Sequence, residues 1–385
     1  MHTGPILIAD ITGYSRYLNE SELVHAEQTL SALLELLVEQ TRPPLVVSKL
    51  EGDAVFSYGL DATGIRGQAF VEAIEACYVE FRRALELMVL NTTCPCNACA
   101  NISSLDLKFF VHYGEFVVGE TAGRAELHGR DVNVLHRLLK NDVTADTGVR
   151  AYAMFTHESV EALDLEELTD GMTRHAGTYA DVGPVVAWVE DLVPVWEHAK
   201  ADRAEGLSDE EVLMELATTI ALSIDVVWSH LIDSEYRQIL NGADRMELSD
   251  LRKGRAGEGS VYRCWHGTRE TTQLIVDWRP LQSIVTRDTT KMGGASFTFP
   301  VEYSLEELPQ GTRLVQRSGV SDGPFVAKAI MKQLLPRRMK DQATVVLIPS
   351  PSCSAELTAP IRWPTSCRRT WPDGTCRKAS GPWRE

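Results

Sequence analysis

The 385-residue sequence lacks any apolar run long enough to cross a membrane. A membrane-spanning helix needs about 20 predominantly apolar residues, and the most apolar stretch, residues 213–228, contains Glu215 and Asp225. Residues 1–18 also lack the basic segment of a secretory signal, and Asp10 interrupts their short apolar run. We therefore expect no membrane span and a cytoplasmic location.

Basic residues and cysteines are scarce as well. Lys and Arg number 38 against 54 Asp and Glu, which leaves a formal charge of −16. Nucleic acids and anionic membranes attract basic surfaces, so we expect neither to be a partner. Eight cysteines in a chain without a secretory signal favour reduced thiols or a metal site over disulfides.

What is present is an ordinary globular composition, with 44% hydrophobic residues and a length that predicts two domains. Within residues 1–195, apolar runs and leucine stripes alternate. They predict, in order, a strand at 6–9, a helix at 21–40, strands at 45–50 and 54–58, a helix at 67–89, a strand at 105–112 and a helix at 130–140. The order βαββαβ predicts an α+β fold of the ferredoxin-like type, with helices on one face of an antiparallel sheet.

Behind this unit, residues 196–210 are polar and charged, which favours a linker. A second domain is expected over 211–340. It would contain strands at 217–222, 260–265, 273–278 and 296–303 and helices at 226–240 and 324–335. Residues 341–385 show no periodicity and are expected to form a disordered tail.

Two aspartates stand out in the first domain. Asp10 ends a buried strand ahead of Thr12 and Gly13, and Asp53 lies in the turn of the hairpin over 45–58. If the two strands are neighbours, both carboxylates converge at one end of the sheet, and such oxygen ligands suit Mg²⁺ or Mn²⁺. The alternative is that Asp10 caps the following segment and Asp53 fills an ordinary turn.

A second set of polar residues lies on a helix and a strand. Asn133 and Arg137 are four residues apart on one helix face, an arrangement that suits charge on a phosphorus transition state or simply a solvated face. Lys49 lies on the strand before Gly52, where lysines usually pair with a carboxylate.

Four motifs occur in order: residues 8–15 (IADITGYS), 49–53 (KLEGD), 112–114 (HYG) and 129–137 (GRDVNVLHR). Together they resemble the catalytic domain of class III adenylate/guanylate cyclases over about half the chain. The resemblance implies that Asp10 and Asp53 bind two Mg²⁺ or Mn²⁺ ions. It also implies attack of the ATP 3′-hydroxyl on the α-phosphorus, which yields cyclic AMP and pyrophosphate.

The same resemblance implies roles for other residues. The loop with Thr12 and Gly13 would face the phosphates, Lys49 and Glu126 would read adenine, Asn133 would orient the ribose, and Arg137 would stabilise the transition state. The family's site forms across a head-to-tail dimer, so ATP and a second copy of the chain are the implied partners.

Two positions depart from the family. Glu126 stands where adenylate cyclases usually carry aspartate, and Val182 stands where the family often has a lysine for the triphosphate. Arg174 is a candidate to replace that charge. These departures favour the alternative of a catalytically silent, cyclase-like module that binds a nucleotide or a lipid and signals.

The segment Cys94–Cys99 (CPCNAC) is absent from ordinary cyclases. Three thiols within six residues suit zinc, and Cys77 or His112 is the expected fourth ligand; the alternative is a reduced cysteine loop. The pattern also resembles an uncharacterised bacterial family that joins a cyclase-like domain to a second module.

Residues 211–340 resemble the START-like or polyketide-cyclase-like helix-grip fold, through segments 220–228, 257–262 and 276–278. Such folds wrap a curved sheet around a long C-terminal helix and enclose an apolar cavity, which implies a hydrophobic small molecule as ligand. Trp228, Trp265 and Trp278 are candidates to line the cavity or to be ordinary core aromatics. We expect the ligand to modulate the first domain.

Overall fold

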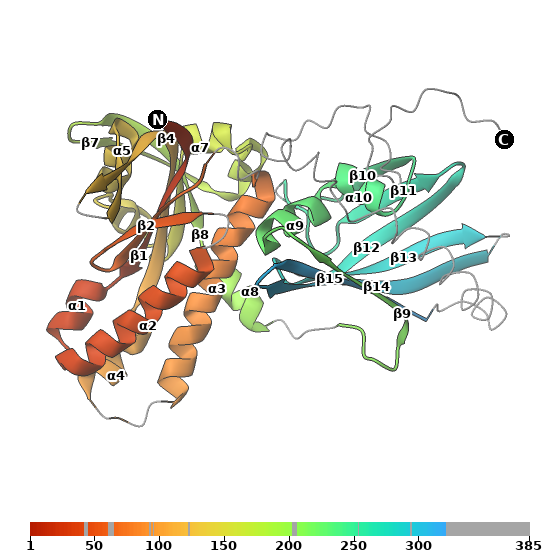
Figure 1. The fold of residues 1–385 in the computed structure, drawn as a ribbon, viewed down its shortest axis with the longest axis horizontal. Helices are drawn as coiled ribbons and strands as arrows, with labels where there is room; N and C mark the ends of the chain where they lie inside the picture. Colours follow the sequence, from red (N-terminus) through yellow and green to blue (C-terminus); the bar gives the residue numbers. More distant parts are fainter. Residues whose placement is uncertain are drawn as a thin grey trace. The chain divides into compact units, whose positions relative to one another are not determined.

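The computed structural model describes residues 1–41, 45–60, 65–91, 94, 96–121, 124–201, 206–252, 254–292 and 295–320. The chain divides into two compact units, Met1–Arg203 and Ala204–Glu385 (Figure 1). In the described residues, no helix is both long and apolar enough to span a bilayer. The expected helix at 324–335 and the expected tail at 341–385 lie outside the described residues.

Unit 1 is a mixed α/β structure. Its elements are β1 (His2–Thr12), α1 (Tyr14–Asn19), α2 (Leu23–Thr41), β2 (Val46–Glu51), β3 (Ala54–Tyr58), α3 (Gly67–Asn91), α4 (Asn97–Asn101), β4 (Asp106–Thr121), β5 (Arg124–His128), α5 (Arg130–Leu138), α6 (Val143–Thr147), β6 (Tyr152–Thr156), α7 (His157–Ala162), β7 (Thr173–Tyr179), β8 (Gly183–Asp191) and α8 (Val193–Ala201). Helix α8, which buries Trp196, occupies the first part of segment 196–210.

The sheet of unit 1 has the order β2-β3-β1-β4-β6-β8-β7, with β5 paired to β4. The first four strands pair antiparallel as β2-β3-β1-β4, which is the arrangement that the predicted order βαββαβ produces. Strand β4 runs beyond residue 112, where the sequence predicted its end. It pairs with β1 as far as Phe116 and continues as a hairpin with β5.

The helices cover both faces of this sheet, because side chains alternate along each strand. Leu7 of β1 and Phe70 of α3 line the same small cavity, and α2 and α3 run side by side on that face (Figure 1). Ile6 and Ile8 face the other way and share a core cluster with Leu135 of α5. Helix α5 therefore lies opposite α2 and α3, so the expectation that the helices share one face holds only for α2 and α3.

The described residues of unit 2 form a seven-stranded antiparallel sheet and two helices. Its elements are β9 (Val212–Ile220), α9 (Ile224–Ile232), α10 (Ser234–Leu240), β10 (Arg245–Ser249), β11 (Val261–His266), β12 (Arg269–Arg279), β13 (Ser283–Met292), β14 (Ala295–Leu308) and β15 (Gly311–Gly319). The strand order is β10-β11-β12-β13-β14-β15-β9. The single helix expected at 226–240 is two helices, because Asp233 starts a new one by accepting a hydrogen bond from the Tyr236 N–H (2.9 Å).

Two tryptophans pack against each other in the core of unit 2. Trp228 and Trp278 are buried and meet edge to face at 5.3 Å. Trp265 is less buried and lies under the guanidinium of Arg245 (3.9 Å). Trp228 and Trp278 are therefore core aromatics, and Trp265 belongs to a separate contact.

Candidate active site

Asp10 and Asp53 meet at one end of the unit 1 sheet. Asp10 pairs with Ala54 of β3 and with Lys108 of β4, so it lies on the central strand of the first four. Asp53 occupies the β2–β3 turn, and its carbonyl oxygen accepts a hydrogen bond from the Ile11 N–H (3.1 Å). The strands β1 and β3 are neighbours, so the two aspartates lie at the same end of the sheet.

The electrostatics of the pair reflect this proximity. Burial and then the neighbouring charge of Asp53 raise the pKa of Asp10 to about 6, while Lys108 opposes the shift. Burial also raises the pKa of Asp53. Both carboxyl groups are therefore partly buried, and a bound cation would stabilise their charged form.

The loop after β1 approaches the segment that leads into β4. Gly13 has a left-handed backbone (φ +91°), and a Cβ there would lie 3.3 Å from the carbonyl oxygen of Ser104. The Thr12 hydroxyl is buried and has no hydrogen-bond partner among the described residues. A buried hydroxyl two residues after Asp10 is suited to a ligand that brings its own polar atoms.

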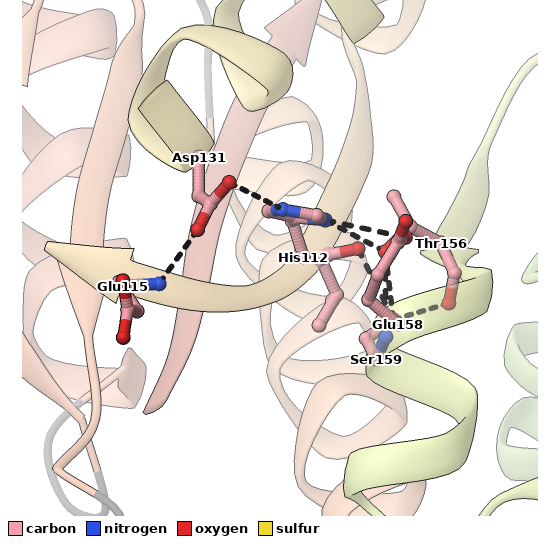
Figure 2. Close-up of polar contacts among 7 residues, drawn as sticks. His112, Glu115, Asp131, Thr156, Glu158 and Ser159 are labelled. Atoms are coloured by element: carbon pink, nitrogen blue, oxygen red, sulfur yellow. Dashed lines mark hydrogen bonds and ion pairs between the residues drawn. The ribbon is translucent and has the colours of Figure 1, made fainter. Parts of the chain in front are cut away.

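A network around His112 fixes the start of α5 (Figure 2). The His112 ring lies between Thr156 and Asp131, with Nδ1 at 2.8 Å from the Thr156 hydroxyl and Nε2 at 3.8 Å from the Asp131 carboxylate. Burial lowers the pKa of His112, although Glu158 and Asp131 favour its charged form. The second carboxylate oxygen of Asp131 accepts the N–H of Glu115 (2.7 Å).

Two glycines permit this contact between β4 and α5. A Cβ at Gly114 would overlap the carboxyl group of Asp131, and a Cβ at Gly129 would lie 2.8 Å from the Glu115 carbonyl oxygen. The motifs at 112–114 and 129–137 thus contact each other where β4 meets the start of α5. This contact positions the helix that carries Asn133 and Arg137.

Gly114→Ala is expected to lower the free energy of unfolding by about 1–2 kcal/mol or more, because the new methyl group would overlap the Asp131 side chain from its carboxylate to its Cβ. Urea denaturation of the full chain would measure the loss. In an Asp131→Gly background the same glycine change should cost much less, since both the carboxyl group and the Cβ that the new methyl group would meet are gone. Equal costs in both backgrounds would contradict the proposed contact.

Asn133 and Arg137 lie on the outer face of α5, while Val132, Leu135 and Leu138 are buried beneath it. Arg137 donates to Asp181 in the β7–β8 turn (2.7 Å). The pair is exposed, so it stabilises the fold little and is easily exchanged for another anion. Asp181 adjoins Val182, the position where the sequence lacks the expected lysine.

Lys49 contacts a carboxylate within the same chain. Its ammonium lies 2.6 Å from Glu51, whose other oxygen is 3.5 Å from His136 of α5. His136 also stacks on Phe56 (5.3 Å), which links α5 to the β2–β3 hairpin. Glu126 lies on β5, which contacts β2, the strand of Lys49.

Three residues of this region were not predicted from the sequence to belong to the site. Lys108 pairs with Asp10, but it lies within a strand that the sequence predicts from its apolar residues alone. Nothing in the sequence pairs Asp181 with Arg137 or His136 with Glu51, because these partners are distant in the chain. Arg174, the candidate for the missing lysine, is exposed on β7.

The cysteine loop is a separate cluster with a different fourth member. The ligand atoms of His25, Cys94, Cys96 and Cys99 all lie within 4.8 Å of one another. The expectation of Cys77 or His112 was wrong. Cys77 is buried in α3, and His112 belongs to the network around α5.

Comparisons with known proteins found similarities over part of the chain. A family model described as "Protein of unknown function (DUF2652)" matches residues 30–147. "Uncharacterized protein Rv2561/Rv2562" from Mycobacterium tuberculosis is 30% identical over 136 residues, or 35% of this chain. The match spans 60% of that relative's own length.

Two solved structures of adenylyl cyclases are similar over about half the chain. A bacterial light-regulated adenylyl cyclase matches with 14% identity and a TM-score of 0.38, covering 52% of this chain and 56% of its own. The adenylyl cyclase CyaB from P. aeruginosa matches with 15% identity and a TM-score of 0.36, covering 54% and 97%. The likeness is one of fold over part of the chain and assigns no role to any residue.

Proposed function

We propose that unit 1 is a nucleotidyl cyclase that converts ATP to cyclic AMP and pyrophosphate. The observation that carries the proposal is the Asp10–Asp53 pair at one end of the sheet, where each carboxyl group has a raised pKa. The helix with Asn133 and Arg137, held by the His112 network, supplies the polar groups that such a reaction needs.

The donor set fits hard divalent cations. It offers two carboxylates and the buried Thr12 hydroxyl, and oxygen ligands are those that Mg²⁺ and Mn²⁺ prefer. When bound, two such ions would lower the pKa of the ribose hydroxyl and offset the charge of the phosphates. The remaining tasks, orienting the ribose and stabilising the charge at phosphorus, fall to Asn133 and Arg137.

The proposed site is shared by two chains in a homodimer. Asn133 is exposed on the outer face of α5, and Arg137 is held by the exposed Asp181. In a homodimer, the aspartates of one chain and the Asn133 and Arg137 of the other would face the same bound ATP. Lys49 would leave Glu51 to read the adenine, together with Glu126.

The test is formation of cyclic nucleotides from ATP and from GTP with Mn²⁺, in a sample shown to be folded and dimeric. We expect cyclic AMP to predominate, because the Lys49 ammonium can donate a hydrogen bond to an acceptor atom of adenine. Guanylate cyclases usually carry a carboxylate at this position instead. Preference for GTP would contradict the role of Lys49. No product from either nucleotide would contradict the proposed enzyme.

One observation favours a second candidate, a catalytically silent nucleotide-binding module. Asp181 places a carboxylate on Arg137 next to Val182, where the family often has a cation for the triphosphate. Nucleotide binding without turnover, measured by calorimetry with Mn²⁺ and ATP, would support this alternative.

For unit 2 we propose a START-like domain that binds a hydrophobic small molecule and modulates unit 1. The support is the connection β9–α9–α10 followed by six antiparallel strands, together with an aromatic core. A change in cyclase rate on adding an apolar ligand that unit 2 binds would test the coupling.

A further inference from the structure

We propose that His25, Cys94, Cys96 and Cys99 form a zinc site that fastens α2 to the start of α4. The four side chains come from the first turn of α2, the segment after α3 and the start of α4. All four are partly buried, and His25 lies about 70 residues before the three cysteines in the sequence.

The distances match a tetrahedral site. Nδ1 of His25 lies 3.1 Å from the sulfur of Cys96, 3.6 Å from that of Cys94 and 3.8 Å from that of Cys99. In a tetrahedron with Zn–S near 2.3 Å and Zn–N near 2.05 Å, each nitrogen–sulfur edge is about 3.6 Å. The cluster thus has the size of a zinc coordination shell without any large movement.

The ligand chemistry selects zinc among common cations. Three sulfurs and one imidazole make a Cys₃His set, typical of closed structural zinc sites, and they exclude Mg²⁺ and Ca²⁺, which take oxygen ligands. The N–H of Cys99 also donates to the sulfur of Cys96 (3.5 Å), which orients that sulfur within the cluster.

Neighbouring contacts already hold the two helices in this arrangement. Glu22, just before α2, accepts hydrogen bonds from the N–H of Ala98 (3.0 Å) and the side chain of Asn97 (3.3 Å). The segment after α4 then reaches Ser104, whose carbonyl oxygen lies against Gly13. Zinc would therefore stabilise the surroundings of the Thr12–Gly13 loop as well as the helix contact.

The first test is the metal content of the full-length protein, purified under reducing conditions. We expect about one zinc per chain, and X-ray absorption should show three sulfurs near 2.3 Å and one nitrogen near 2.05 Å. Zinc removal by a chelator should lower the thermal midpoint, and added zinc should restore it. These measurements do not involve nucleotides, so their outcome is independent of whether the proposed cyclase activity is found.

Variants separate zinc binding from general damage. His25→Ala and Cys96→Ser should each retain less than about 0.1 zinc per chain after dialysis, whereas His25→Cys, which restores a four-ligand set, should retain the metal. His157→Ala, at an exposed histidine outside the cluster, should keep full zinc content. With Co²⁺ in place of zinc, His25→Cys should shift the visible spectrum towards that of a Cys₄ site.

Three results would overturn the site. One is a wild-type protein without zinc that also takes up none when it is added to the reduced sample. A second is a loss of free thiols through a disulfide within the cluster. The third is iron with inorganic sulfide in place of zinc.

Discussion

Asp53→Asn is expected to reduce the rate of cyclic AMP formation from ATP by about 10³-fold or more, with Mg²⁺ or Mn²⁺ present. The change keeps the shape of the side chain but removes one of the two charges on which the cations depend. Loss of several kcal/mol of charge stabilisation in the transition state corresponds to such a factor. Initial rates at saturating Mn²⁺ and ATP would measure it.

The same variant should leave the fold intact. Burial raises the pKa of Asp53, so replacing its carboxylate removes a desolvated charge and should not lower the free energy of unfolding. Asp170→Asn, at an exposed carboxylate of the same unit, is the matched control and should keep wild-type activity. Activity of Asp53→Asn within about tenfold of wild type would contradict the two-aspartate site.

A further readout needs no activity. Asp53 contributes to the raised pKa of Asp10, second only to burial, so the pKa of Asp10 should fall in metal-free Asp53→Asn. Proton binding to Asp10 would then shift to lower pH, which NMR titration of the carboxyl carbon measures. An unchanged pKa would mean that the two carboxylates do not interact.

The central strands of unit 1 could be predicted from the sequence because their signals are local. Apolar runs at 6–9, 45–50 and 54–58 fix strands whose order then brings Asp10 beside the turn of Asp53. The topology needs only the short hairpin and the rule that neighbouring strands pair. The position of the aspartate pair could therefore be predicted from the order of the strands, whereas its function could not.

The remaining features depend on contacts between distant residues. His25 lies on a polar turn of α2 with no pattern that links it to cysteines about 70 positions later. The Arg137–Asp181 pair likewise joins two exposed side chains 44 residues apart. The break between α9 and α10 depends on one capping side chain, Asp233, within an otherwise continuous helical pattern.

Mixing two inactive variants is expected to restore cyclic AMP formation if the site is shared between chains. Arg137→Ala should lose about 10²–10³-fold in rate, because it removes the cation that faces the transition state. In an equal mixture with Asp53→Asn, half of the dimers are mixed, and each mixed dimer contains one site with both native halves. The mixture should therefore reach about a quarter of wild-type activity.

The control for this experiment pairs Asp53→Asn with Asp10→Asn, whose defects lie in the same half of the site. No mixed dimer of these two has an intact site, so activity should stay at background. If Arg137→Ala and Asp53→Asn form mixed dimers, seen by native mass spectrometry of tagged chains, but regain no activity, the two residues act within one chain. Exchange of Asp181 for an ATP phosphate would then have to occur on the same subunit that carries the aspartates, and the exposed Arg137–Asp181 pair leaves that route open at little energetic cost.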